Sequence, residues 1–103
     1  MTITLQNLAL DRWVEAPGGF VDIPSAVDGK TVARASSAGL DFAAMVRHAR
    51  DVGGANLRTL TFHQRADRLK AIAAYVSERK EQLYKLAGDT GASRRDNAVD
   101  IEG

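Results

Sequence analysis

Two histidines are the first residues of this sequence whose type could do chemistry. His48 stands on a basic segment and His63 stands where a helix is expected to begin. A metal site needs three or four ligands with converging geometry, and no spacing of carboxylates and histidines here suggests one. We therefore predict no metal site and expect both histidines at surface or boundary positions, which this residue type often occupies.

Three carboxylates near the end of the sequence could serve as a general acid and base. Asp96 and Asp100 would share one face of a helix, and Glu102 follows them. Like charges four residues apart destabilise a helix unless each finds a partner. Because Arg94 and Arg95 stand beside them, we expect solvated or inter-element ion pairs here rather than catalysis.

The sequence contains no cysteine. This excludes a disulfide, a thiolate metal site and a thiol nucleophile from the given residues. Its glycine pairs, Gly18-Gly19 after Pro17 and Gly53-Gly54, lack the strand, loop and helix context of a phosphate-binding loop. We interpret both as turns and predict no catalytic and no cofactor-binding residue.

A basic cluster is a candidate nucleic-acid face. Its members are Arg47, Arg50, Arg58, Arg65, Arg68 and Lys70. The cluster lacks aromatic residues for base stacking, apart from Phe62 in an apolar stripe, and Asp51 and Asp67 interrupt its charge. We expect no nucleic-acid partner, and a face that is solvated or that meets acidic groups elsewhere in a larger protein.

The composition is that of a globular protein, with 103 residues, 45% of them hydrophobic, and a net charge of +1. It predicts one small domain at most, or a piece of a larger one. The longest apolar run, residues 71–76, is far below the ~20 residues that a membrane-spanning helix needs. No targeting segment is visible, so a cytoplasmic protein without a membrane partner is the expectation.

The elements that would position these residues are short β strands in residues 1–36 and helices in residues 41–103, an α/β chain. Residues 20–23 and 31–35 are two β-prone runs, and the Asp28-Gly29 pair between them can supply a tight hairpin turn. We predict a β-hairpin here, with an irregular arm as the alternative.

The helical part contains several start and stop signals. Asp41 is predicted to cap a helix that runs to about residue 52 and ends at the Gly53-Gly54 pair. Thr61 and Gln64 have the spacing of a capping box, and Gly88 is a candidate C-cap. The segment 61–88 carries an apolar stripe at helical spacing, Phe62, Leu69, Ile72, Val76, Leu83 and Leu86.

Two features of the last segments complete the helical prediction. Glu81 and Lys85 stand four residues apart in the order that favours a helix, with a break expected near Ser77. Residues 93–102 are predicted to begin another helix, for which no packing partner is evident. We therefore expect the sequence to be truncated.

The order of these segments resembles the start of an aldehyde dehydrogenase. The resemblance covers residues 5–103 and rests on Leu5-x-Asn7 with Trp13, the hairpin turn, Gln64-Arg65-Ala66-x-x-Leu69 and Asp89-Thr90-Gly91. The Lys-Pro that usually follows Thr-Gly in the superfamily is replaced by Ala92-Ser93, and its common glycine before the tryptophan is absent. These departures favour one branch, the CoA-thioester semialdehyde dehydrogenases of aromatic-acid degradation.

Three stretches carry this narrower resemblance, residues 36–41, 53–62 and 90–103. They are similar to the bifunctional PaaZ-like proteins of phenylacetate degradation, in which the dehydrogenase is joined to a hydratase that opens oxepin-CoA. Semialdehyde dehydrogenases of the benzoyl-CoA epoxidation route are the close alternative. The resemblance implies an oxidoreductase that uses NADP or NAD on a CoA-linked semialdehyde and forms a homo-oligomer when complete.

The resemblance also implies where the chemistry would lie. The family places its cysteine nucleophile, oxyanion asparagine, glutamate base and nucleotide-binding fold beyond position 103. Residues 1–103 would then be the incomplete amino-terminal part of the coenzyme-binding domain, inactive alone, with the remainder of the fold as partner. The alternative is a free-standing helical interaction module that binds through the 61–88 stripe.

Overall fold

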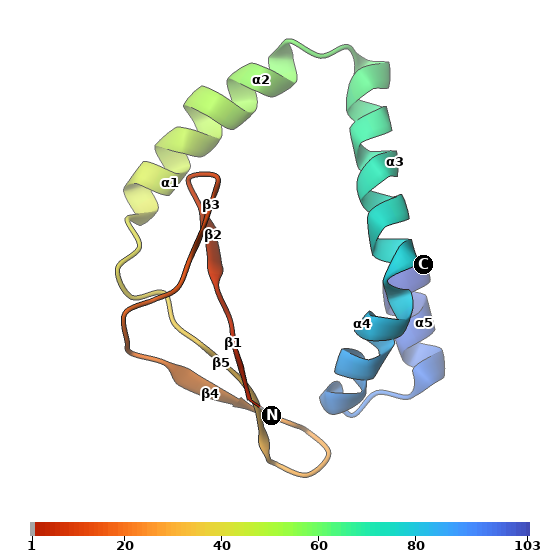
Figure 1. Cartoon of the computed structure of the whole chain (residues 1–103). Helices are drawn as coiled ribbons and strands as arrows, with labels where there is room; N and C mark the ends of the chain where they lie inside the picture. The colour runs from red at the N-terminus through yellow and green to blue at the C-terminus, as the bar shows by residue number, and fades with distance from the viewer. Residues whose placement is uncertain (1) are drawn as a thin grey trace. The chain divides into compact units, whose positions relative to one another are not determined.

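The computed structural model describes residues 2–103, and it confirms an α/β chain in which short strands precede helices (Figure 1). The chain divides into two compact units. Unit 1 holds the residues up to Pro24 together with Thr31–Leu60, and unit 2 holds Ser25–Lys30 together with Thr61–Gly103. Each unit is described by itself.

The predicted hairpin is confirmed, and both of its strands belong to unit 1. Strands β4 (Val21–Pro24) and β5 (Thr31–Ala35) pair antiparallel. Gly29 in the turn has a φ of +72°, which glycine adopts without steric cost. Strand β1 (Ile3–Thr4) adds to β5 in parallel, so the sheet order is β1-β5-β4. The irregular arm, the alternative for this segment, is therefore wrong.

A second hairpin, which the sequence did not reveal, joins β2 (Asn7–Ala9) to β3 (Arg12–Val14). Its turn residues, Leu10 and Asp11, have φ angles of +52° and +62°. A two-residue turn with two left-handed positions matches the right-handed twist of paired strands. The usual Asn-Gly or Asp-Gly signal is missing, and Asp11 alone hinted at this turn.

The first predicted helix begins as expected but ends later. Asp41 caps α1 (Phe42–His48), since its Oδ1 accepts a hydrogen bond of 3.0 Å from the Ala44 amide. The helix continues through a π-helical segment (Ala49–Gly54) into α2 (Ala55–Arg58) (Figure 1). The predicted stop at Gly53-Gly54 is wrong, because a glycine costs only about 1 kcal/mol inside a helix and does not forbid it.

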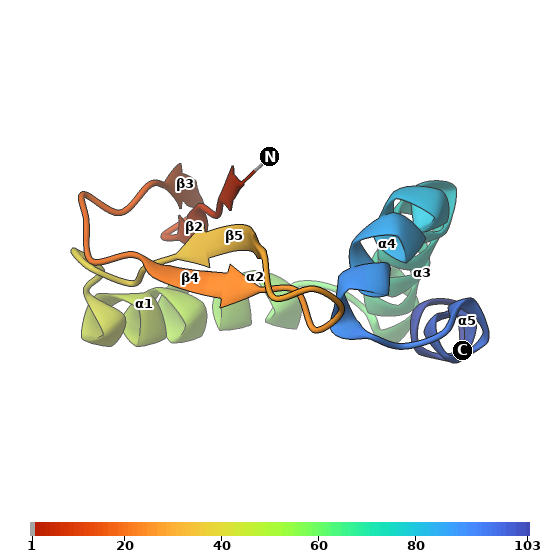
Figure 2. The same ribbon diagram turned by 90° about the horizontal axis from the view of Figure 1, so that it is seen from below.

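Unit 2 is built from helices whose starts were visible in the sequence. The capping box of Thr61 and Gln64 opens α3 (Phe62–Glu78), as predicted. A break at Arg79 separates α3 from α4 (Lys80–Ala87), two residues beyond the expected place. A second capping box, formed by Ser93 and Asp96, opens α5 (Arg94–Glu102), which lies beside α4 (Figure 2).

The connection between α4 and α5 is hydrogen-bonded to the Ser25–Lys30 loop. Gly88 is the C-cap of α4, as predicted, but the chain continues for one 3₁₀ turn (Gly88–Thr90) and becomes left-handed at Gly91. Asp89 in this turn accepts a hydrogen bond of 3.0 Å from Ser25 Oγ, and its carbonyl accepts one of 2.8 Å from the Ala26 amide. Ser25 is buried by this contact.

Neither unit has a closed hydrophobic core. Among residues 2–103 the buried ones are Ala9, Ala16, Ser25, Tyr84 and Asn97, and none of their side chains is less than 2% exposed. Most large apolar side chains of the helices and strands are therefore open to solvent. Within the same residues, no helix combines the length and the apolarity needed to cross a bilayer.

Candidate functional site

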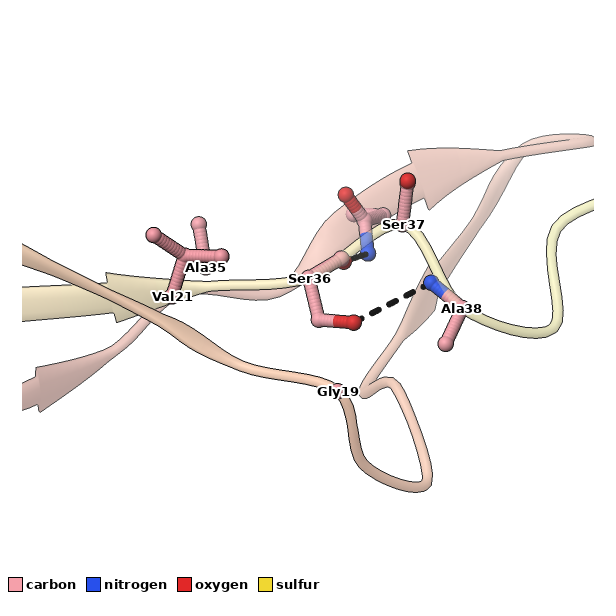
Figure 3. A pocket seen from close by; sticks show the side chains of 7 residues that line it. Gly19, Val21, Ala35, Ser36, Ser37 and Ala38 are labelled. Atoms are coloured by element: carbon pink, nitrogen blue, oxygen red, sulfur yellow. Dashed lines mark hydrogen bonds between the residues drawn. The ribbon is translucent and has the colours of Figure 1, made fainter.

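A shallow hollow of about 580 Å³ lies in unit 1, where β2 meets the segment that follows β5 (Figure 3). The side chain of Ser36 organises its rim. Ser36 Oγ donates to the Gly18 carbonyl at 2.6 Å and accepts from the Ala38 amide at 3.1 Å, as Figure 3 shows for the second bond. Asn7 Nδ2 donates to the Ser36 carbonyl at 2.7 Å.

The hollow is not equipped for catalysis. Its lining residues are Asn7, Gly19, Val21, Ala35, Ser36, Ser37 and Ala38, and none of them titrates. The Ser36 hydroxyl is already engaged by two backbone groups, so it is held as a structural link rather than as a nucleophile. Val21 and Ala35 contribute apolar side chains to its lining (Figure 3), and such a lining suits a side chain from a packing partner.

The histidines occupy the surface and boundary positions that were predicted. His48 in α1 is half-buried, and its Nε2 lies 3.0 Å from Asp11 Oδ2 in the β2–β3 turn. His63 is exposed in the first turn of α3, where its ring meets Phe62 edge-on with 6.2 Å between centroids. In the described part of the chain, no group of three or more His, Cys, Asp or Glu side chains could hold a metal ion.

The three candidate carboxylates separate into different structural roles. Asp96 closes the capping box of α5, so the ion pair expected for it is replaced by a cap. Asp100 is exposed on the same helix, and Glu102 bonds to α4, as described below. Arg94 pairs with Glu81 of α4 at 3.1 Å, which is an inter-element pair of the kind expected.

The predicted stabilising pair between Glu81 and Lys85 is wrong. The Glu81 carboxylate accepts two hydrogen bonds from Arg94 Nη2, at 3.1 and 3.3 Å, and these draw it across to α5. A planar guanidinium suits a carboxylate better than an ammonium does, and this contact also ties two helices together.

Tyr84 is the most enclosed large side chain of unit 2, at 8% exposure. Its hydroxyl donates to Glu102 Oε2, and Lys80 Nζ lies 3.0 Å from Glu102 Oε1. The Arg94 guanidinium covers the Tyr84 ring, 4.5 Å from its centroid. This cluster fastens α5 to α4, and no sequence motif had pointed to Tyr84.

The cluster shifts two titrations in opposite directions. The hydrogen bond from Tyr84, with the one from Lys80, holds the pKa of Glu102 below its usual 4.5. The hydrogen bond to Glu102, with burial, raises the pKa of Tyr84 above its usual 10.0. Since Glu102 binds its proton more weakly when folded, its contribution is present above pH 4.5 and lost as the pH falls. Since Tyr84 binds its proton more tightly when folded, its contribution is present below pH 10 and lost as the pH rises.

We therefore predict that the packing of α5 against α4 is most stable between about pH 4.5 and pH 10. Amide chemical shifts of α5, followed by NMR from pH 7 to pH 3, should show a transition in the wild type. In the Glu102→Gln variant the acid transition should disappear, because the amide still accepts the tyrosine proton but does not titrate. A transition that persists unchanged in Glu102→Gln would assign it to another group.

The remaining sequence candidates have structural roles. Gly19 has a φ of +68° in the turn that precedes β4, as predicted for this glycine pair. Gly53 and Gly54 are helical, so the second pair is not a turn. Neither pair lies between a strand and the N-terminus of a helix, so these residues do not fit the pyrophosphate of a nicotinamide coenzyme.

The apolar stripe of α3 is an exposed surface of unit 2 to which no role has been assigned. Phe62 is 77% exposed and Ile72 is 60% exposed, and Leu69 is similarly open. Exposed apolar surface of this kind marks an interaction site in a stable protein. The stripe was predicted from spacing alone, and the structure shows that these three side chains stay largely uncovered by the rest of residues 2–103. The stripe is therefore a candidate docking surface.

Comparison with known proteins adds one finding to this geometry. No family model matches the chain. The chain is similar to a 3,4-dehydroadipyl-CoA semialdehyde dehydrogenase of Aromatoleum evansii, at 32% identity over 100 residues. The match includes 96% of this chain but only 19% of the relative, so the chain spans about a fifth of the length of the curated relative it matches.

Proposed function

We propose that this chain is the amino-terminal part of the coenzyme-binding domain in an NAD(P)-dependent aldehyde dehydrogenase of aromatic-acid degradation. The observation that carries the proposal is the match of nearly the whole chain to one fifth of a semialdehyde dehydrogenase. The substrate class is a CoA thioester that ends in an aldehyde, as the name of that relative describes. Phenylacetate and benzoyl-CoA routes both supply such compounds.

The open apolar faces support a role as part of a larger fold. A chain with well-formed helices and strands but so few buried side chains obtains little stability from hydrophobic burial. Packing the α3 stripe and the apolar lining of the hollow against a larger body would supply the missing core. The chain would then contribute structure around the coenzyme-binding sheet.

The chemical steps of such an enzyme lie with groups that these residues lack. Attack on the aldehyde carbonyl needs a thiolate, and the sequence has no cysteine. The nicotinamide coenzyme would accept a hydride in the complete enzyme, and the glycines present here do not form its phosphate cradle. We therefore assign no catalytic step to this chain and expect it to be inactive alone.

Further features of the complete protein follow from the same proposal. They are a cytoplasmic location, the use of NADP or NAD, a homo-oligomeric assembly and a fused hydratase domain that opens oxepin-CoA. Each is an expectation for the whole polypeptide, since the chain spans 19% of its relative.

A free-standing interaction module that binds through the 61–88 stripe is the second candidate, and the exposure of Phe62 and Ile72 favours it equally. The intact mass of the protein isolated from its source separates the two. A mass several times the 11.1 kDa of this chain supports the dehydrogenase, whereas 11.1 kDa itself supports the module.

The decisive experiment is a chimaera in which this chain replaces the matching 100 residues of the Aromatoleum evansii enzyme. We expect the chimaera to fold and to reduce NADP⁺ or NAD⁺ with that enzyme's own semialdehyde substrate. The same enzyme with the segment deleted should be inactive. A folded chimaera without activity would contradict the proposed function.

A further inference from the structure

A row of five residues, each four positions after the last, runs along the α1–α2 helical stretch: Phe42, Val46, Arg50, Gly54 and Arg58. Its first half is apolar and its second half is basic. All four side chains of the row are exposed.

The π-helical segment reduces the drift of this row around the helix axis. In an α-helix a step of four residues exceeds the 3.6-residue turn, so such a row drifts around the axis. A π-helical turn is wider, and a step of four residues there drifts in the opposite direction. Because Ala49–Gly54 lies in the middle of the stretch, the two drifts oppose each other. The row therefore drifts less between Phe42 and Arg58 than it would in an uninterrupted α-helix.

The arginines of the row form no ion pair within residues 2–103. Arg58 Nη1 lies 3.3 Å from the place where a Cβ on Gly54 would stand, so its guanidinium folds back over the glycine along the row. Among the described residues, no carboxylate forms an ion pair with Arg50, Arg58 or the neighbouring Arg47. The single acidic residue of the stretch, Asp51, leaves it with a net positive charge.

Resting on the proposed function, we propose that this row docks on an acidic and apolar surface of the remaining dehydrogenase polypeptide. About four fifths of the relative lies outside the match, so a large body is available as the occupant. The partner surface places apolar side chains against Phe42 and Val46 and carboxylates opposite Arg50 and Arg58. Charge complementarity of this kind sets register more than it adds affinity.

The mixed character of the row favours a protein surface over a nucleic acid. A phosphate backbone would match Arg50 and Arg58 but leave Phe42 and Val46 against water or charge. Asp51 beside the row would also repel phosphates. A folded protein surface can satisfy both halves at once.

The test uses the chimaera described above and reads its rate of thermal inactivation or unfolding. The variant Arg50→Glu/Arg58→Glu should unfold about tenfold faster or more at low salt, because two charge-paired contacts become repulsive. The difference should shrink at 1 M NaCl, where charges are screened beyond about 3 Å. Arg12→Glu/Lys85→Glu makes the same change of charge at two exposed residues off the row and should leave the rate within about twofold.

Each outcome tests the docking of the row separately from the proposed dehydrogenase function. An active chimaera in which both double variants unfold at the same rate overturns this inference and leaves the function intact. An inactive chimaera still reports on the row, since unfolding is measured directly. If the fusion does not fold, the purified chain is titrated into the relative that lacks its matched segment. Absence of salt-sensitive binding in that titration overturns the inference.

Binding of a DNA duplex is the outcome that would favour a nucleic acid instead. The inference is overturned if Arg50→Glu/Arg58→Glu abolishes binding to DNA but changes neither the unfolding of the chimaera nor the titration.

Discussion

The substitution Ile72→Asp is expected to leave the stability of the isolated chain almost unchanged. In the chimaera, where the stripe would be docked, it should lower the free energy of unfolding by several kcal/mol. Ile72 is 60% exposed on the α3 stripe, and exposed substitutions usually change stability by no more than about 0.5 kcal/mol. In a docked stripe the same change removes a buried side chain, worth about 2–5 kcal/mol, and adds an unpaired charge.

The measurement compares urea midpoints of the chimaera with helicity of the isolated chain, for the wild type and two variants. Ala71→Asp is the matched control, since it adds the same charge at the exposed position just before Ile72, which is not a member of the stripe. It should be tolerated better in the chimaera. Equal tolerance of both variants there would show that the stripe is not a docking surface.

The isolated chain is expected to unfold without a sharp transition. A domain of about 100 residues normally unfolds cooperatively, with a heat-capacity increase of about 1.2–1.5 kcal/mol/K from newly exposed apolar surface. Here most large apolar side chains are exposed before unfolding begins. The heat-capacity change should therefore be well below that range, and helicity should decline over a wide temperature interval.

Scanning calorimetry and circular dichroism at monomer-like size test this expectation. Binding of a hydrophobic dye to the unheated chain should accompany the broad transition, because the α3 stripe is open. A sharp two-state transition of a monomer, with calorimetric and van't Hoff enthalpies that agree, would contradict the proposal that the chain needs a larger body. It would favour the free-standing module.

The elements that were predicted correctly depend on chemistry within a few residues. The cap at Asp41, the capping box at Thr61 and the Gly29 turn are each satisfied by hydrogen bonds or φ angles that involve near neighbours in sequence. The apolar spacing of the 61–88 segment likewise predicts a helix without any knowledge of what covers it. Such local signals are readable in a sequence.

The errors arose where a local preference competes with its surroundings. Gly53-Gly54 has a weak tendency to end a helix, and the continuous α1–α2 stretch overrides it. The Leu10-Asp11 turn carries no strong signal, since pairing of β2 with β3 imposes its left-handed angles. In both places the hydrogen bonds of the surrounding helix or hairpin outweigh the cost of an unfavourable local conformation.

The succession of strands and helices, the caps at Asp41 and Thr61 and the apolar stripe could all be predicted from the sequence, because each depends on residues a few positions apart. The lack of a thiol nucleophile is equally plain, since no cysteine is present. The partners of charged and aromatic groups emerged only from the tertiary structure, such as Tyr84 with Glu102, 18 residues apart, and Arg94 with Glu81, 13 residues apart. It also decided that Ser25 bonds Asp89, 64 residues away. Such contacts form between positions that chain folding brings together, and no periodicity along the sequence encodes that proximity.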